Sequence, residues 1–218
     1  MFDRATNYNE KADLQKNIAK KLCQLAAKEI TLSRTFLDVG CGTGFAGKEA
    51  LKLNEKLIIH GVDKSDKMLE IASRFYHKTF HISLENFVSE VKYDIAISSM
   101  CLQWCENIDE KISLLLKNCK ELYFAIPEPE SLKELANCFL KEGMENPILQ
   151  FKIPQKLEPF HVECFEENFP NLLSVFKSFK EIGVRNQENL LTYGKLKKLE
   201  KHFQGKISWK IGFYKVFA

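Results

Sequence analysis

The sequence lacks the features of secreted, membrane-spanning and metal-binding proteins. Its 218 residues include only six prolines, and none of its seven cysteines forms a Cys-x-x-Cys pair. An odd cysteine count without zinc-knuckle spacing argues against a disulfide framework and a metal site, so we expect reduced thiols and a cytoplasmic protein. No apolar run approaches the roughly 20 residues of a membrane span, and the polar start of the chain does not read as a signal peptide.

The charge is nearly balanced, because 32 Lys and Arg residues face 29 Asp and Glu residues for a net charge of +3. This balance gives no strong reason to expect binding to nucleic acid or to a membrane surface. A hydrophobic content of 45% is enough for a substantial core and argues against disorder. We therefore expect a single domain over residues 1–218, and a monomer.

Short strand patterns alternate with helical patterns through the first 130 residues. The runs at 95–97 and 122–126 are almost continuously apolar, which is typical of strands buried on both faces of a parallel sheet. The alternation predicts an α/β, Rossmann-like fold with helices on both faces of a mostly parallel sheet. The expected strands are 35–39, 57–62, 79–82, 94–99 and 121–126, and the expected helices are 10–29, 45–53, 66–75 and 108–118.

The second half of the chain is less regular. Ser131 and Glu134 have the spacing of a capping box, which predicts a helix to about residue 140. The glycine and prolines of 143–160 predict irregular structure, and we expect about 128–165 to form a cap or lid. Helical patterns follow at 168–182 and from Thr192 to 202. Alternation at 207–213 predicts a closing antiparallel strand.

The most informative stretch is the turn after the first strand. Asp38 ends an apolar strand, Gly40, Gly42 and Gly44 alternate in the turn, and a helical pattern begins at once. Glycine allows a sharp turn and a close approach of the backbone to a ligand. This arrangement is typical of the nucleotide-binding corner of a doubly wound fold.

Two ligands fit this turn. Gly42, Gly44 and Gly47 match the dinucleotide pattern Gly-x-Gly-x-x-Gly, and Asp63 follows at about the required distance, which suggests NAD. Alternatively, Asp38 with the three alternating glycines resembles motif I of the class I S-adenosylmethionine methyltransferases. A carboxylate beside the turn repels a pyrophosphate but attracts the α-ammonium and sulfonium of S-adenosylmethionine, which favours the second interpretation.

The segment after the fourth strand limits the class of molecule that could accept the methyl group. Enzymes that methylate nucleic-acid bases place an Asn/Asp-Pro-Pro-aromatic motif there, and this chain has no proline in that segment. Its run Leu102-Gln103-Trp104-Cys105 resembles the BioC enzymes, the malonyl-acyl-carrier-protein O-methyltransferases of biotin synthesis. The resemblance includes the opening run from Phe2 through Tyr8 to Gln15 and the helical run 172–183, and so spans nearly the whole chain.

The resemblance implies a seven-stranded class I fold, with an N-terminal helix (residues 1–30) over the active site. It also implies S-adenosylmethionine as cofactor and S-adenosylhomocysteine as product. The cofactor would be bound by Asp38, Gly40, Cys41, Gly42, Gly44, Asp63, Lys64, Met68, Ser83, Leu84 and Ser99. Ser83 stands where the family usually has an adenine-contacting Asp, and the Leu84 backbone N–H could still reach the ring.

The same resemblance implies a malonyl thioester on acyl-carrier protein, or malonyl-CoA, as substrate. Tyr8 and Gln103 would be the catalytic residues, and the substrate would contact Trp104, Arg4, Lys177 and Arg185. The lysines of the C-terminal half (Lys177, Lys180, Lys195, Lys197, Lys198 and Lys201) would suit an acidic carrier protein. Two alternatives remain, namely methylation of another small carboxylic acid and a non-catalytic subunit that binds S-adenosylmethionine.

Overall fold

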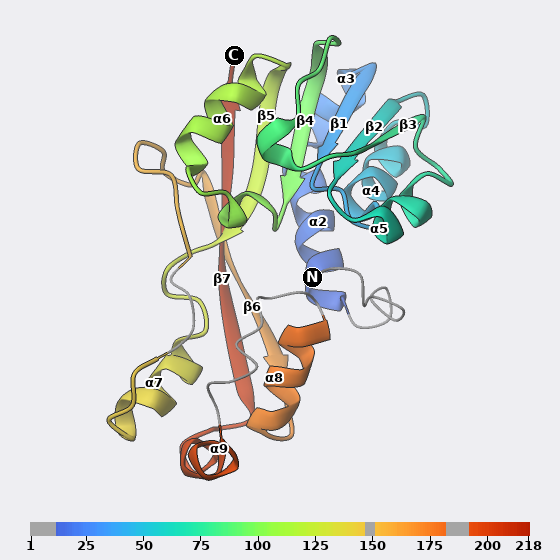
Figure 1. Cartoon of the computed structure of the whole chain (residues 1–218). Helices are drawn as coiled ribbons and strands as arrows, with labels where there is room; N and C mark the ends of the chain where they lie inside the picture. The colour runs from blue at the N-terminus through green and yellow to red at the C-terminus, as the bar shows by residue number, and fades with distance from the viewer. Residues whose placement is uncertain (1–11, 147–150, 182–191) are drawn as a thin grey trace.

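The computed structural model describes residues 12–146, 151–181 and 192–218. Within them a single seven-stranded sheet has the order β3-β2-β1-β4-β5-β7-β6 (Figure 1). Strands β1 to β5 pair in parallel, whereas β7 is antiparallel to both β5 and β6. The expected fold class is therefore confirmed. The strands are β1 (Thr35–Val39), β2 (Ile58–Asp63), β3 (Lys78–His81), β4 (Tyr93–Ser99), β5 (Cys119–Pro127), β6 (His161–Asn168) and β7 (Lys206–Phe217).

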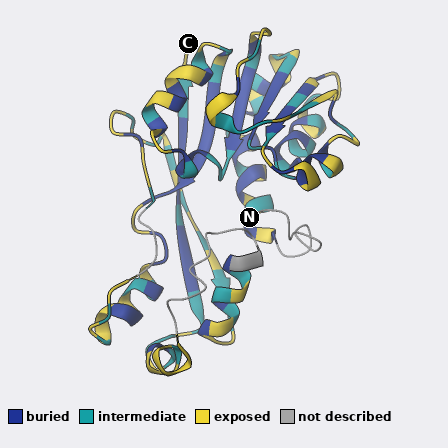
Figure 2. Cartoon of the chain, viewed as in Figure 1, coloured by how far each residue is buried: buried dark blue, intermediate teal, exposed yellow. Residues whose placement is uncertain are grey.

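Helices cover both faces of the parallel part of the sheet (Figure 1). Successive residues of a strand point to opposite faces, and β1 follows this rule. Phe36 packs in the cluster that contains residues of α2 (Asp13–Leu25) and α4 (Phe45–Leu53), and Leu37 packs in the cluster that contains residues of α6 (Ile108–Leu116). The central strands β1, β4 and β5 are accordingly mostly dark blue, or buried, in Figure 2. The helices on this part of the chain are α2 (Asp13–Leu25), α3 (Ala27–Leu32), α4 (Phe45–Leu53), α5 (Asp66–Ala72) and α6 (Ile108–Leu116).

The last two strands project beyond the rest of the sheet and carry a second lobe (Figure 1). Residues 211–217 of β7 pair with β5, whereas residues 206–213 pair with β6, so the lower half of this two-stranded ribbon lies outside the parallel sheet. Three helices, α7 (Lys133–Lys141), α8 (Leu172–Glu181) and α9 (Tyr193–Glu200), surround its end. The segment expected as a cap contributes α7 and β6 to this lobe.

Three local expectations were wrong. The capping box does not form, because Ser131 Oγ bonds the backbone of Lys210 and Glu134 accepts hydrogen bonds from Ser208, both on β7. Tertiary contacts thus use the two side chains that would have capped α7. The helix expected over 10–29 breaks at Ala26, and β6 was not expected as a strand. Thr192 does cap α9, by accepting a hydrogen bond from Lys195 N.

Candidate active site

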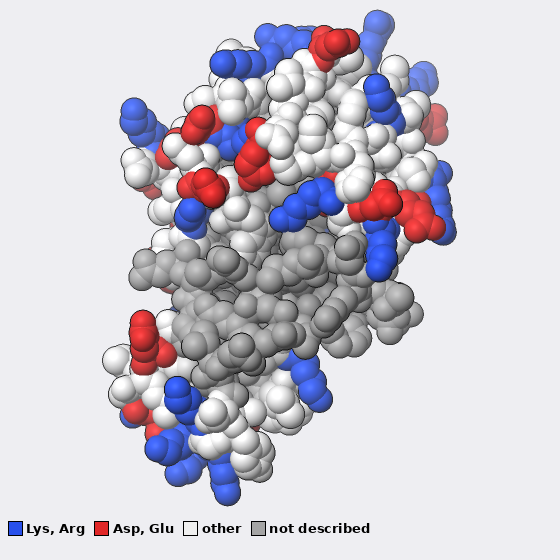
Figure 3. Space-filling view, viewed as in Figure 1, with Lys and Arg blue, Asp and Glu red and all other residues white. Residues whose placement is uncertain are grey.

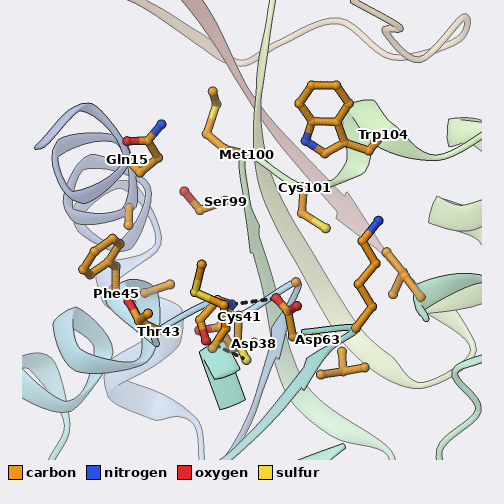
Figure 4. Close-up of a pocket in the computed structure, with 18 of the residues that line it drawn as sticks. Gln15, Asp38, Cys41, Thr43, Phe45, Asp63, Ser99, Met100, Cys101 and Trp104 are labelled. Carbon is orange, nitrogen blue, oxygen red and sulfur yellow. Dashed lines mark hydrogen bonds between the residues drawn. The ribbon is translucent and has the colours of Figure 1, made fainter. Parts of the chain in front are cut away.

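A pocket lies at the carboxyl ends of β1, β2 and β4 (Figure 4). Open α/β sheets bind ligands at this edge, where loops from several strands converge. Its walls come from the glycine turn, the residues after β2 and β4, and the facing sides of α2 and α4. Eleven residues singled out in the sequence line it: Asp38, Gly40, Cys41, Gly42, Asp63, Lys64, Met68, Leu84, Ser99, Gln103 and Trp104.

Three other candidates that the structure describes, Gly44, Ser83 and Lys177, do not line this pocket. Gly44 caps the start of α4 just behind the turn, and Ser83 precedes the short 3₁₀ helix η2 (Leu84–Asn86) without lining the pocket. Lys177 is exposed on α8, in the second lobe. Arg4, Tyr8 and Arg185 lie outside the described residues.

The glycine turn is held tightly against the end of β2. The backbone N–H groups of Gly40 and Cys41 both donate to Val62 O, at 2.8 and 3.0 Å. Gly40 has φ +66°, and a Cβ there would lie 2.1 Å from Cys101 Sγ. A side chain at this position would therefore be strained and would also collide with the segment after β4.

Asp63 stabilises the turn from the end of β2. Its Oδ2 accepts from Gly42 N at 2.8 Å, and its Oδ1 accepts from Ser65 N at 2.9 Å. These two bonds fix the carboxylate at the pocket wall, as the dashed line in Figure 4 indicates for Gly42. A carboxylate oxygen can accept more than one hydrogen bond, so Asp63 retains acceptor capacity toward a ligand.

Asp38 is almost fully buried, with 2% of its surface exposed. Its Oδ2 accepts hydrogen bonds from Tyr76 Oη and, at 3.3 Å, from Gly47 N in the first turn of α4. Burial raises the pKa of this carboxyl to about 7, although the two hydrogen bonds oppose that rise. Both of these hydrogen bonds use Oδ2, and Asp38 is among the residues that line the pocket.

Three residues that line the pocket each carry a buried oxygen without a hydrogen-bond partner among the described residues. These oxygens are Oε1 of Gln15 on α2, Oγ of Ser99 at the end of β4, and Oε1 of Gln103 in the 3₁₀ helix η3 (Leu102–Trp104). A buried polar atom without a partner costs about 1–3 kcal/mol. A polar ligand or ordered waters in the pocket would give these atoms partners.

Sequence reasoning missed several lining residues, including Gln15, Phe45, Glu85 and Met100. Gln15 carried a usable signal, because it lies four residues before buried Ala19 and therefore on the same face of an amphipathic helix. The others carried none that we recognise, because only the fold brings them to the pocket. Buried Lys111 on α6 donates a hydrogen bond to Leu84 O at 2.7 Å and so links α6 to η2.

No group of three or more His, Cys, Asp or Glu side chains among the described residues could hold a metal ion. No helix in the same residues is long and apolar enough to cross a membrane.

Comparisons with known proteins agree with this geometry. A family model described as a methyltransferase domain matches residues 37–123. The malonyl-[acyl-carrier protein] O-methyltransferase of Priestia megaterium is 27% identical, over 84% of this chain and 79% of that protein. The malonyl-[acyl-carrier protein] O-methyltransferase 1 of Ilyobacter polytropus is 28% identical, over 94% and 85% of the two chains.

Solved structures share the fold at low sequence identity. The plantazolicin methyltransferase BpumL, solved in complex with SAH, has a TM-score of 0.53 and 13% identity, over 96% of this chain and 88% of that one. Coclaurine N-methyltransferase has a TM-score of 0.55 and 9% identity, over 93% and 72% of the two chains. The chain thus carries a methyltransferase domain and has the fold of S-adenosylmethionine-dependent methyltransferases.

Proposed function

We propose that the protein transfers a methyl group from S-adenosylmethionine to the free carboxylate of a malonyl thioester held on acyl-carrier protein, an early step of biotin synthesis. The observation that carries this proposal is the position of the run Leu102-Gln103-Trp104-Cys105. The last three of these residues line the pocket. The relatives named as malonyl-[acyl-carrier protein] O-methyltransferases, which match most of the chain, support the same acceptor.

In this proposal the cofactor lies along the glycine turn. Gly40, Cys41 and Gly42 provide a backbone surface that a ligand can approach closely. Asp63 would accept hydrogen bonds from the ribose hydroxyls, and Asp38 Oδ1 would face the cationic methionine end. The Leu84 backbone would contact adenine, with Ser83 beside it. Lys64, Met68 and Ser99 would complete the walls, and Gly44 would shape the turn from behind.

When bound, S-adenosylmethionine supplies an electrophilic methyl group on a sulfonium. The carboxylate oxygen forms a bond to the methyl carbon while the carbon–sulfur bond breaks and its electron pair stays on sulfur. A carboxylic acid titrates near pH 4, so the acceptor is already ionised at neutral pH and needs no general base.

The protein would therefore act by placing and desolvating the acceptor. The Gln103 amide would bind the substrate carboxylate, and the Trp104 ring would exclude water from it. Tyr8 and Arg4 would approach from the N-terminal segment, which lies outside the described residues. Lys177 and Arg185 are the further cations proposed for the substrate.

A mass-spectrometric assay tests the proposal. Wild-type protein with S-adenosylmethionine and malonyl-acyl-carrier protein should add one methyl group to the malonyl thioester. Gln103→Leu should lower turnover about tenfold or more while cofactor affinity stays near wild type. Asp63→Ala should lower cofactor affinity itself. Gln24→Leu, at an exposed position of α2, is the matched control and should change neither quantity.

The assay also tests the identity of the methyl acceptor independently of the identity of the methyl donor. Cofactor binding without methylation of any malonyl thioester would exclude the proposed acceptor and leave the methyltransferase assignment intact. Free malonate and other small dicarboxylic acids, tested in parallel, would then show whether an untethered acid is the substrate.

A further inference from the structure

One face of α9 is covered by lysines. Lys195, Lys197 and Lys198 on α9 and Lys201 at its C-cap, which together we call the α9 lysine face, are all exposed. At about 100° per residue they fall within roughly half of the helix circumference. Leu199 on the other side is fully buried. In Figure 3, blue lysine and arginine side chains gather at the lower end of the molecule, where Figure 1 places α9.

These lysines form no ion pairs within the described part of the chain, in contrast to those of β7. Lys206, Lys210 and Lys215 each pair with a carboxylate at 3.4 Å or less. The only acidic residue within α9 is Glu200, and its Oε2 accepts from Leu172 N at the start of α8. The carboxylate therefore binds inside the lobe and does not neutralise the lysines.

The register of the sheet sets the separation between this face and the pocket. Ser99 at the pocket pairs with Ala125, which pairs with Phe213 of β7. From there β7 extends back to Lys206, just beyond the end of α9. At about 3.4 Å per residue this stretch spans roughly 24 Å. A substrate that reached from α9 to the pocket would need a long, extended arm.

Resting on the function proposed above, we propose that the α9 lysine face is the docking surface for the acidic protein that carries the malonyl thioester. A carrier protein presents its acyl group at the end of a flexible pantetheine arm, which suits a docking site remote from the chemistry. Unpaired lysines complement its acidic surface and would speed and orient its approach. The second lobe would then position the carrier while the first lobe performs the transfer.

Charge reversal tests this docking surface. Lys195→Glu, Lys198→Glu and Lys201→Glu together change a row along the helix. The matched control is Lys56→Glu, Lys92→Glu and Lys117→Glu, three exposed lysines just before β2, β4 and β5, at the opposite end of the sheet from the pocket. Both triple variants alter the net charge equally, so any difference between them reports location.

The primary measurement is the dissociation constant for fluorescently labelled malonyl-acyl-carrier protein at low ionic strength. We expect the α9 variant to bind at least tenfold more weakly and the control to stay within about twofold of wild type. Added salt should weaken wild-type binding and have less effect on the α9 variant, because surface charges are screened beyond about 10 Å at 0.1 M salt. A folded α9 variant that binds like wild type would overturn the docking proposal. Equal weakening in both variants, or no saturable binding by wild type, would also overturn it.

Methylation of malonyl-pantetheine separates docking from the proposed function. This substrate has the arm and the thioester but no acidic protein, so the α9 variant should methylate it at the wild-type rate. If the wild-type protein methylates neither malonyl-pantetheine nor malonyl-acyl-carrier protein, the proposed function is wrong. The binding measurement would still decide the docking proposal. Because lysines near a helix C-terminus also stabilise the helix, thermal unfolding of each variant serves as the folding control.

Discussion

Tyr76 Oη donates a hydrogen bond to Oδ2 of Asp38, although 38 residues separate the two in the chain and both side chains are buried. Gly47 N donates to both partners, at 3.1 Å to Tyr76 Oη and 3.3 Å to Asp38 Oδ2. The Tyr76 ring also fills the space beside Gly61 on β2. This contact thus ties the end of β1, the start of α4 and the segment after α5 together beneath the glycine turn.

Replacing Tyr76 by Phe removes the hydroxyl donor and keeps the ring. Burial raises the pKa of Asp38, and the Tyr76 hydrogen bond opposes that rise, so the variant carboxyl should titrate at a higher pH. We expect the affinity for S-adenosylmethionine at pH 7 to fall about three- to tenfold and its pH midpoint to move upward. Calorimetric titration from pH 6 to 9 measures both quantities.

The control for this variant is Tyr93→Phe. Tyr93 is also buried, but its hydroxyl lies 2.8 Å from His60 Nδ1 and is not part of the pocket. Its loss should leave the pH midpoint of cofactor binding unchanged. A wild-type midpoint in Tyr76→Phe would mean that ionisation of Asp38 does not govern cofactor binding.

Asp38 should also make the stability of the ligand-free protein depend on pH. Its pKa rises from an ordinary 3.8 to about 7 on folding, mainly through burial. A raised carboxyl pKa stabilises the fold fully below pH 4, and this contribution is lost as the pH rises to 7. The shift corresponds to at most about 4 kcal/mol. Asp38→Asn should remove this component, so urea unfolding of the variant at pH 5 and pH 8 should differ less than that of wild type.

Gly47→Ala should destabilise the protein although alanine is normally favoured within a helix. A Cβ at residue 47 would lie 2.2 Å from Tyr76 Oη, so the tyrosine would have to move. Overpacking of this kind costs about 1–3 kcal/mol. Gly194→Ala on α9 is the matched control, because its Cβ would meet nothing within 4 Å and its unfolding free energy should stay equal or rise slightly. Equal effects of the two variants in urea unfolding would contradict this account.

The parts of the fold predictable from sequence are those set by neighbouring residues. β1 and α4 have the expected bounds, because an apolar strand, three alternating glycines and a helical pattern follow one another directly. Asp38 and Asp63 could also be placed at the pocket, because each ends a strand and parallel strands end at the same edge of a sheet.

Contacts between distant segments were not predictable. The partners of Ser131 and Glu134 lie more than 70 residues away on β7, so a local capping pattern gave the wrong result. β6 alternates half-buried and exposed residues and is rich in glutamate, which hides it from a search for apolar strands. Tyr76 lacks any local pattern that would connect it to Asp38, and its role emerges only from the packing of three elements.

Because Oε1 of Gln15 has no partner among the described residues, we expect a substitution there to raise stability but to lower ligand affinity. Gln15→Leu removes a buried acceptor that has no partner among the described residues, so the ligand-free protein should become more stable, by up to about 1–2 kcal/mol. If Gln15 binds a ligand in the pocket, the same change should weaken the affinity for S-adenosylmethionine or the malonyl substrate about fivefold or more. Unfolding curves with and without each ligand measure both effects, with Gln24→Leu as the exposed control. If Gln15 only supports packing, Gln15→Leu should lower the unfolding free energy and leave ligand affinity unchanged. A gain in stability together with a loss of affinity therefore distinguishes a binding residue from a packing residue.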